Sequence, residues 1–144
     1  MRIKRLMKCD VKYVRETATI RDACRAMVKN GIGCVLVENQ DGELAGILTE
    51  SDVVRCVAQG RTPDEPVRAE MTKKVITIDS SADVADAINL MVKKKIKKLV
   101  VMHNGRVVGM ATATDILHLG DEIENELLMK LAHFFPIQRR SVAG

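Results

Sequence analysis

The stretch Gly46-Ile47-Leu48-Thr49-Glu50-Ser51-Asp52 organises this chain, because it returns as Gly109-Met110-Ala111-Thr112-Ala113-Thr114-Asp115. In each copy an apolar run ends at a glycine and two further hydrophobic residues. Thr-x-x-Asp then precedes a second apolar run with helical spacing. The pattern predicts a strand that runs directly into the N-terminus of a helix. The first N–H groups of a helix lack intrahelical partners and carry the positive end of its dipole, so such a junction can receive an anion.

The Thr-x-x-Asp spacing has two compatible interpretations. The hydroxyl and the carboxylate stand beside the helix end, where they can hydrogen-bond a polyol or a phosphate. The same spacing is also that of a capping box, which only satisfies the donors of the helix. A cap residue can keep one oxygen for a ligand, and the presence of two copies in matching surroundings favours a binding role.

The repeat extends well beyond this motif. A shift of 64 positions aligns Ile3 with Val67, Met7 with Met71, Asp22 with Asp86 and Met27 with Met91. The register then slips by one, so that Gly46 aligns with Gly109 at a shift of 63. The slip lies where residues 39–42 of the first copy align with residues 103–105 of the second. Asp-Gly in the one and Asn-Gly in the other predict hairpin turns with positive φ.

Each repeat predicts the order β-α-β-β-α, which gives a mixed α/β (α+β) fold. The expected strands span residues 11–14, 34–38, 44–48, 75–78, 99–102 and 106–111, and the expected helices span 19–30, 51–59, 83–94 and 113–119. We expect repeat 1 over residues 1–60, a linker over 61–66, repeat 2 over 67–120, and a C-terminal helix and tail over 121–144. Because a unit of about 60 residues is marginal alone, the repeats should pack together about a pseudo-twofold axis.

Composition excludes several classes of protein. The chain has 144 residues, a net charge of +4 and 2% aromatic residues. Few rings are available to stack bases, which disfavours a nucleic-acid platform. No apolar run is long enough for a membrane span and the start lacks a signal-peptide core, so we expect a cytoplasmic protein without membrane contact.

The sequence contains no pattern typical of an enzyme. It has neither a serine elbow nor a Walker loop, so we expect no catalytic residue and no catalytic cofactor. The four cysteines form no Cys-x-x-Cys pair and lie among apolar neighbours, which favours buried, reduced thiols. The three histidines are isolated, so we expect no metal site.

Three features together resemble one family, over about residues 3–119. They are residues 67–72 (VRAEMT) before a strand, residues 30–37 (NGIGCVLV), and the doubled Gly-h-h-Thr-x-x-Asp, where h is hydrophobic. The chain is similar to a tandem pair of CBS domains, the regulatory module named after cystathionine beta-synthase. The resemblance implies a regulatory, non-enzymatic module that binds adenosine-containing ligands, commonly AMP, ADP or ATP, and sometimes S-adenosylmethionine or NAD.

The resemblance also implies roles for residues at matching positions. Asp52 and Asp115 would hold ribose hydroxyls, while Thr49 and Thr112 would meet phosphate. The base would lie against the leading segment and second strand, near Val14 and Cys34 or near Ile78 and Lys98. The full set of expected ligand-binding residues is Val14, Gly33, Cys34, Thr49, Ser51, Asp52, Ile78, Lys97, Lys98, Thr112, Thr114 and Asp115.

Lysines distinguish the two expected sites. Lys97 and Lys98 precede a strand at positions where the resemblance to the gamma subunit of AMP-activated protein kinase implies contact with phosphates. Gly33 and Cys34 stand at these positions in repeat 1, which predicts two unequal sites. Lys93 to Lys95 are interpreted instead as a solvated helix end.

The resemblance further implies a homodimer, a flat disc of two CBS pairs, through Val53, Val54, Val57, Ile116, Leu117 and Leu119. Ligand in the cleft between the repeats would shift their orientation and signal to an effector protein that the sequence does not identify. Residues 121–135 predict an amphipathic helix, ended by Pro136 before a basic tail, that docks on its own module or on a second copy. The alternatives are a ligand-independent scaffold and a nucleic-acid-associated protein.

Overall fold

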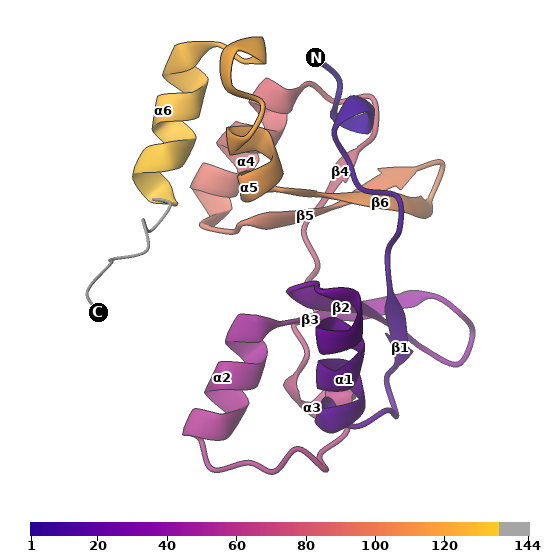
Figure 1. The fold of residues 1–144 in the computed structure, drawn as a ribbon. Helices are drawn as coiled ribbons and strands as arrows, with labels where there is room; N and C mark the ends of the chain where they lie inside the picture. The colour runs from indigo at the N-terminus through magenta and orange to yellow at the C-terminus, as the bar shows by residue number, and fades with distance from the viewer. Residues whose placement is uncertain (136–144) are drawn as a thin grey trace, which may run out of the picture. The chain divides into compact units, whose positions relative to one another are not determined.

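The computed structural model describes residues 1–135, which form two compact units (Figure 1). The first-repeat unit holds Asp10–Val75. The second-repeat unit holds Met1–Cys9 together with the chain from Ile76 onward. Each unit contains one three-stranded sheet. The sequence repeats and the compact units are therefore not coextensive, because the first nine residues pack with elements of repeat 2.

The first-repeat unit has the order β-α-β-β-α followed by a short helix. Its elements are β1 (Tyr13–Arg15), α1 (Ile20–Asn30), β2 (Cys34–Glu38), β3 (Leu44–Thr49), α2 (Glu50–Ala58) and α3 (Val67–Glu70). β1 pairs in parallel with β2, and β2 pairs antiparallel with β3. Ile20, Ala23 and Met27 of α1 are buried against Val35, Val37 and Leu48 of the sheet.

The second-repeat unit has the same β-α-β-β-α order, with η1 before it and η2 and α6 after it. It consists of η1 (Ile3–Arg5), β4 (Thr77–Asp79), α4 (Val84–Lys94), β5 (Lys98–His103), β6 (Arg106–Thr112), α5 (Ala113–Leu117), η2 (Gly120–Glu122) and α6 (Asn125–Phe134). β4 is parallel to β5, and β5 is antiparallel to β6. The predicted mixed α/β fold with two β-α-β-β-α repeats is confirmed.

The predicted helix starts and hairpin turns are also confirmed. α1 begins at a capping box, in which the Thr19 hydroxyl accepts from the Asp22 N–H and the Asp22 carboxylate accepts from the Thr19 N–H. In the turn after β5, Asn104 and Gly105 have φ of 48° and 74°. Gly42 has φ of 76° in the turn after β2. The slip between the repeats thus falls in a loop whose length can change without moving either sheet.

A leading segment completes each unit, and it comes from the opposite repeat. In the first-repeat unit, Thr72 and Ile47 exchange backbone hydrogen bonds of 2.9 and 3.0 Å. In the second-repeat unit, Lys8 and Met110 do the same at 2.8 and 2.9 Å. Each segment therefore lies along the strand that leads into a Thr-x-x-Asp motif.

The C-terminal helix begins at Asn125 rather than at Asp121, which corrects the prediction. Gly120 has φ of 54° and opens the 3-10 turn η2, after which Ile123 is extended and buried. The break lets Ile123 enter the core before α6 starts. α6 then packs on α4 and α5 and fully buries Leu131, so docking on its own module is observed. Pro136 and the basic tail lie outside the described residues.

Candidate functional site

The two Thr-x-x-Asp motifs lie at equivalent strand-to-helix junctions. Thr49 ends β3 and caps α2, while Thr112 ends β6 and caps α5. The strand register places Cys34 opposite Thr49 and Lys98 opposite Thr112. The structure therefore brings together, within each unit, the predicted motif and the predicted residue of the second strand.

The residue before each second strand lies beside the start of the helix. The Gly33 carbonyl accepts from the Glu50 N–H at 3.1 Å, and the Lys97 carbonyl accepts from the Ala113 N–H at 2.8 Å. These bonds place Gly33 and Lys97 at the corners where α2 and α5 begin.

Asp52 is buried, and its carboxylate is hydrogen-bonded within its own unit. Oδ2 accepts from the backbone N–H of Thr49 at 2.9 Å and from its hydroxyl at 3.1 Å. Oδ1 accepts from Arg55 Nη2 at 2.6 Å and from the Thr72 hydroxyl at 3.2 Å. Asp52 thus completes a capping box and also fastens the leading segment to α2.

The Asp115 carboxylate has a different environment. Thr112 Oγ1 accepts from the Asp115 N–H at 3.1 Å, so the helix cap is present. Oδ1 lies 3.4 Å from Lys8 Nζ, and the Lys8 side chain is 74% exposed. Oδ2 is buried and has no hydrogen-bond partner among the described residues. A buried carboxylate oxygen without a donor is unfavourable, and a ligand hydroxyl placed here would satisfy it.

The other predicted residues fall into three positions. Val14 and Ile78 are half-buried and pack against the cores of their units. Ser51 and Thr114 are exposed in the first turns of α2 and α5. Lys98 is half-buried, whereas Lys97 is exposed with its ammonium 5.9 Å from the centre of the Phe135 ring.

Sequence reasoning missed Arg55, Thr72 and Lys8, which contact the motif aspartates. Arg55 lies three residues after Asp52 on the same helix, a spacing that places the two side chains together and that could have identified the pair. Thr72 and Lys8 occupy equivalent positions in the repeat, but the sequence does not say which unit their segments join.

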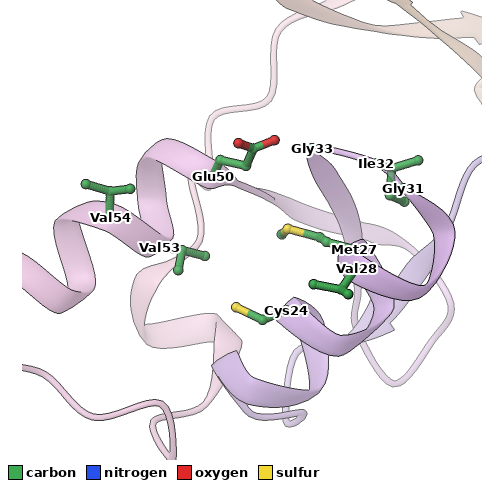
Figure 2. Close-up of a pocket in the computed structure, with 9 residues that line it drawn as sticks. All are labelled: Cys24, Met27, Val28, Gly31, Ile32, Gly33, Glu50, Val53 and Val54. Atoms are coloured by element: carbon green, nitrogen blue, oxygen red, sulfur yellow. The ribbon is translucent and has the colours of Figure 1, made fainter. Parts of the chain in front are cut away.

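An open apolar groove lies between α1 and α2 of the first-repeat unit (Figure 2). It has a volume of about 490 Å³ and includes Cys24, Met27, Val28, Val53 and Val54 in its lining. Val28 and Val54 are 83% and 67% exposed. The equivalent face of the second-repeat unit is covered by α6, so Ile116, expected at a dimer interface, is fully buried within its own unit.

None of the four cysteines, all of which lie in the described residues, forms a disulfide, and their burial differs. Cys56 is buried and Cys24 is half-buried, and burial raises the pKa of both thiols. Cys9 is exposed, so the prediction that all four thiols are buried was wrong. It follows the last residue that pairs with β6 and precedes the charged Asp10, which leaves its side chain outside the core.

Residues 1–135 contain no group of three or more histidine, cysteine or acidic side chains placed to hold a metal ion. Within the same residues, no helix has the length and apolar character needed to cross a membrane.

Sequence comparison finds one family. The model of the CBS domain matches residues 3–59 and again residues 67–122. An uncharacterised protein of Methanopyrus kandleri is 39% identical over 113 residues, which cover 76% of this chain and 58% of that protein. The chain therefore spans little more than half the length of this curated relative.

Solved structures with the same fold include two that carry adenosine compounds. A CBS domain protein of Pyrobaculum aerophilum complexed with AMP has a TM-score of 0.77 and 28% identity, over 92% of this chain and 99% of that one. The CBS domain pair of the protein MJ0100, in complex with 5'-methylthioadenosine and S-adenosyl-L-methionine, has a TM-score of 0.76 and 26% identity. The match covers 83% of this chain and 94% of that one.

Proposed function

The chain belongs to the CBS-domain family, and from this premise we propose that it is a regulatory module that binds an adenine nucleotide at its second Thr-x-x-Asp motif. Structural neighbours that hold AMP, or 5'-methylthioadenosine and S-adenosylmethionine, support an adenosine-containing ligand. The proposal names the residues of this chain that would recognise it.

The unpartnered Oδ2 of Asp115 carries the proposal. A carboxylate accepts hydrogen bonds only, and the two hydroxyls of a ribose are donors at matching spacing. A sugar hydroxyl at Oδ2 would remove the penalty of a buried acceptor without a donor. In this arrangement Asp115 holds the ribose, and Thr112 and Thr114 lie on the same turn.

Lys97 and Lys98 favour a ligand that carries phosphate. The register places Lys98 opposite Thr112, and the Lys97 carbonyl bonds the first N–H of α5. Two cations beside the ribose site attract the phosphates of AMP, ADP or ATP by charge-assisted hydrogen bonds. S-adenosylmethionine has no phosphate to contact these lysines, so we consider it a weaker candidate ligand than the nucleotides. NAD carries phosphates and stays an alternative.

The regulatory step is a shift of population. A ligand that binds one conformation better than another raises the population of the first, and an effector protein that contacts that conformation receives the signal.

A thermal-shift panel tests this function. AMP, ADP, ATP, adenosine, NAD and S-adenosylmethionine are compared on the wild type and on Asp115→Asn. A ligand at 100 times its dissociation constant adds about 2.7 kcal/mol to the free energy of unfolding, and Asp115→Asn should abolish that gain. If none of the six compounds raises the melting temperature, the nucleotide proposal fails and a ligand-independent scaffold is favoured.

The lysines are tested by a matched pair of double variants. Lys97→Ala with Lys98→Ala should weaken AMP by about 1 to 3 kcal/mol and leave adenosine nearly unchanged. Lys93→Ala with Lys94→Ala removes the same charge from the exposed end of α4 and should alter neither affinity. Equal losses for AMP and adenosine in calorimetry would contradict phosphate contact.

The groove between α1 and α2 supports a homodimer, which we propose as the assembly of this module. Val28 and Val54 in its lining are 83% and 67% exposed, and Val57 on the same helix as Val54 is 69% exposed, so three valine side chains face water. In the second-repeat unit the equivalent surface is covered by a helix of the same chain. A second copy that packs α1 and α2 against their counterparts would bury the groove of both chains at once.

Sedimentation measures this assembly. We expect a dimer for the wild type and a monomer for Val54→Glu with Val57→Glu, because two carboxylates at the centre of the contact would lose their hydration. The Lys73→Glu variant should remain dimeric, because Lys73 is exposed and lies outside the groove. A wild-type monomer at all concentrations would reject the dimer and leave the nucleotide site untouched.

A further inference from the structure

We infer that Arg55 closes the first-repeat site, so that each chain binds one nucleotide, at the second motif only. The inference rests on the proposed function and adds to it a stoichiometry and the residue that sets it. One residue in which the two motifs differ is the third after the aspartate, which is Arg55 in repeat 1 and His118 in repeat 2.

The first motif is saturated by its own unit. Arg55 Nη2 lies 2.6 Å from Asp52 Oδ1, and the Thr72 hydroxyl lies 3.2 Å from the same oxygen. Oδ2 accepts hydrogen bonds from the backbone N–H and from the hydroxyl of Thr49. With two donors on each oxygen, the carboxylate has no direction left in which a ribose hydroxyl could approach it.

Charge makes Arg55 a strong competitor for a ligand. A hydrogen bond between a guanidinium and a carboxylate is about twice as strong as one between neutral groups. A ribose hydroxyl is neutral, so it would have to replace a charged donor with an uncharged one. The Asp52 side chain is only 4% exposed, so water would not compensate the carboxylate during the exchange.

The second motif has different residues in place of Arg55 and Thr72. His118 is exposed and forms no ion pair with Asp115 within residues 1–135. Lys8 replaces Thr72 at the equivalent position, and its ammonium lies 3.4 Å from Oδ1 with a mostly exposed side chain. Oδ2 is left without a donor. Donors of its own unit therefore saturate the Asp52 carboxylate, whereas the Asp115 carboxylate has one buried oxygen without a donor among residues 1–135.

The two motifs can be exchanged by one substitution each. Arg55→His installs the residue of the second repeat in the first, and it should free Asp52 Oδ1 for a ribose hydroxyl. His118→Arg installs the arginine beside Asp115, where it should pair with the carboxylate and lower the affinity for AMP at least about tenfold. The second variant adds an ion pair and removes no contact of the core, so it does not depend on whether the first variant is stable.

Calorimetric titration with AMP measures the stoichiometry. We expect one AMP for each wild-type chain, two for Arg55→His, and a large loss of affinity for His118→Arg. Asp115→Asn should bind none, while Arg55→His combined with Asp115→Asn should bind one, at the first motif. Circular dichroism melts verify that each variant is folded before titration.

The outcomes separate this inference from the function on which it rests. Two AMP molecules for each wild-type chain would overturn the role of Arg55 and leave the nucleotide-binding proposal in place. A folded Arg55→His variant that still binds one AMP would do the same. The absence of binding by every variant would overturn both.

Discussion

Gly109 and Lys8 are in contact through their backbones: a Cβ atom added at Gly109 would lie 2.7 Å from the carbonyl oxygen of Lys8. Gly46 has the same relationship to Thr72, at 2.8 Å. The glycine that begins each motif is therefore required because a leading segment crosses directly over it. A backbone carbonyl held by a hydrogen bond to the strand cannot move aside cheaply.

Gly109→Ala should lower the free energy of unfolding by about 1 to 3 kcal/mol, the usual range for overpacking. Met7 Sδ would also lie 3.0 Å from the added atom, so Met7→Ala is the informative second change. If the carbonyl of Lys8 dominates, Met7→Ala will not rescue Gly109→Ala in urea denaturation. Full rescue would show that the flexible methionine side chain is the obstacle.

The sequence predicted these motifs and the elements around them because the repeat supplies every signal twice. Apolar runs, Asp-Gly or Asn-Gly turns and a capped helix recur at a shift of 64 and then 63 positions, so each repeat supports the assignment of the other. What it could not predict is that Met1–Cys9 joins the unit of repeat 2. A segment of a few apolar residues fits either sheet edge by pattern, and only tertiary packing chooses between them.

The difference between the two sites was predicted only in part. The sequence indicated unequal sites only through the expected phosphate contacts, because repeat 1 has Gly33 and Cys34 where repeat 2 has Lys97 and Lys98. The state of the carboxylates depends on Arg55 and Thr72, which reach Asp52 from three residues along α2 and from a separate segment. The first contact follows from helix geometry. The second requires the fold.

Lys95 ends α4 in a left-handed conformation, with φ of 56°, at the position where Gly31 ends α1 with φ of 61°. A side chain in this region costs about 1 kcal/mol relative to glycine. Lys95→Gly should therefore raise the free energy of unfolding by about that amount in urea titration.

The reciprocal change is the control for Lys95→Gly. Gly31→Ala should destabilise by about 1 kcal/mol, and no atom lies within 4 Å of the added Cβ, so the cost is conformational. Lys94→Gly, at the last residue of α4, should also destabilise, by up to about 1 kcal/mol. If Lys95→Gly and Lys94→Gly changed the free energy of unfolding in the same direction, the left-handed conformation of Lys95 would not be the cause of the effect.

Asp22 makes part of the stability depend on pH. Hydrogen bonds from Thr19, first from its backbone N–H and then from its side chain, lower the pKa of the Asp22 carboxyl below its usual value. A carboxyl whose pKa is lower in the folded state stabilises the fold above its unfolded pKa of about 3.9, and this contribution is lost as the pH falls through the folded pKa.

Asp22→Asn should therefore destabilise the protein at neutral pH and have less effect once the pH falls below the lowered folded pKa, where the wild-type carboxyl also becomes neutral. Thermal melts between about pH 2.5 and pH 7 measure the difference. Asp41→Asn, at an exposed turn residue, is the matched charge control. A constant difference between wild type and Asp22→Asn over the whole pH range would argue against the depressed pKa.

Thiol labelling distinguishes the cysteines by burial. Cys9 is exposed, whereas Cys56 is 1% exposed and its pKa is raised by burial, then by the nearby Glu70. The thiolate is the reactive form, so the raised pKa and the low solvent exposure of Cys56 both slow its labelling. Maleimide labelling followed by peptide mapping should modify Cys9 first and Cys56 only on unfolding. Cys9→Ser should remove the fast phase, and fast labelling of Cys56 would indicate local opening of α2.

Leu131 attaches α6 to the second-repeat unit. Its side chain is fully buried, whereas Met129 on the same helix is 63% exposed. Leu131→Ala should cost about 2 to 5 kcal/mol, because it removes buried apolar surface and leaves a cavity between α6 and the helices beneath it. Met129→Ala should change the free energy of unfolding by less than about 0.5 kcal/mol.

Hydrogen exchange measures where the loss occurs: amides of α6 should lose protection in Leu131→Ala while those of α1 and β2 keep theirs. Equal loss of protection in both units would mean that α6 stabilises the whole chain and not one unit.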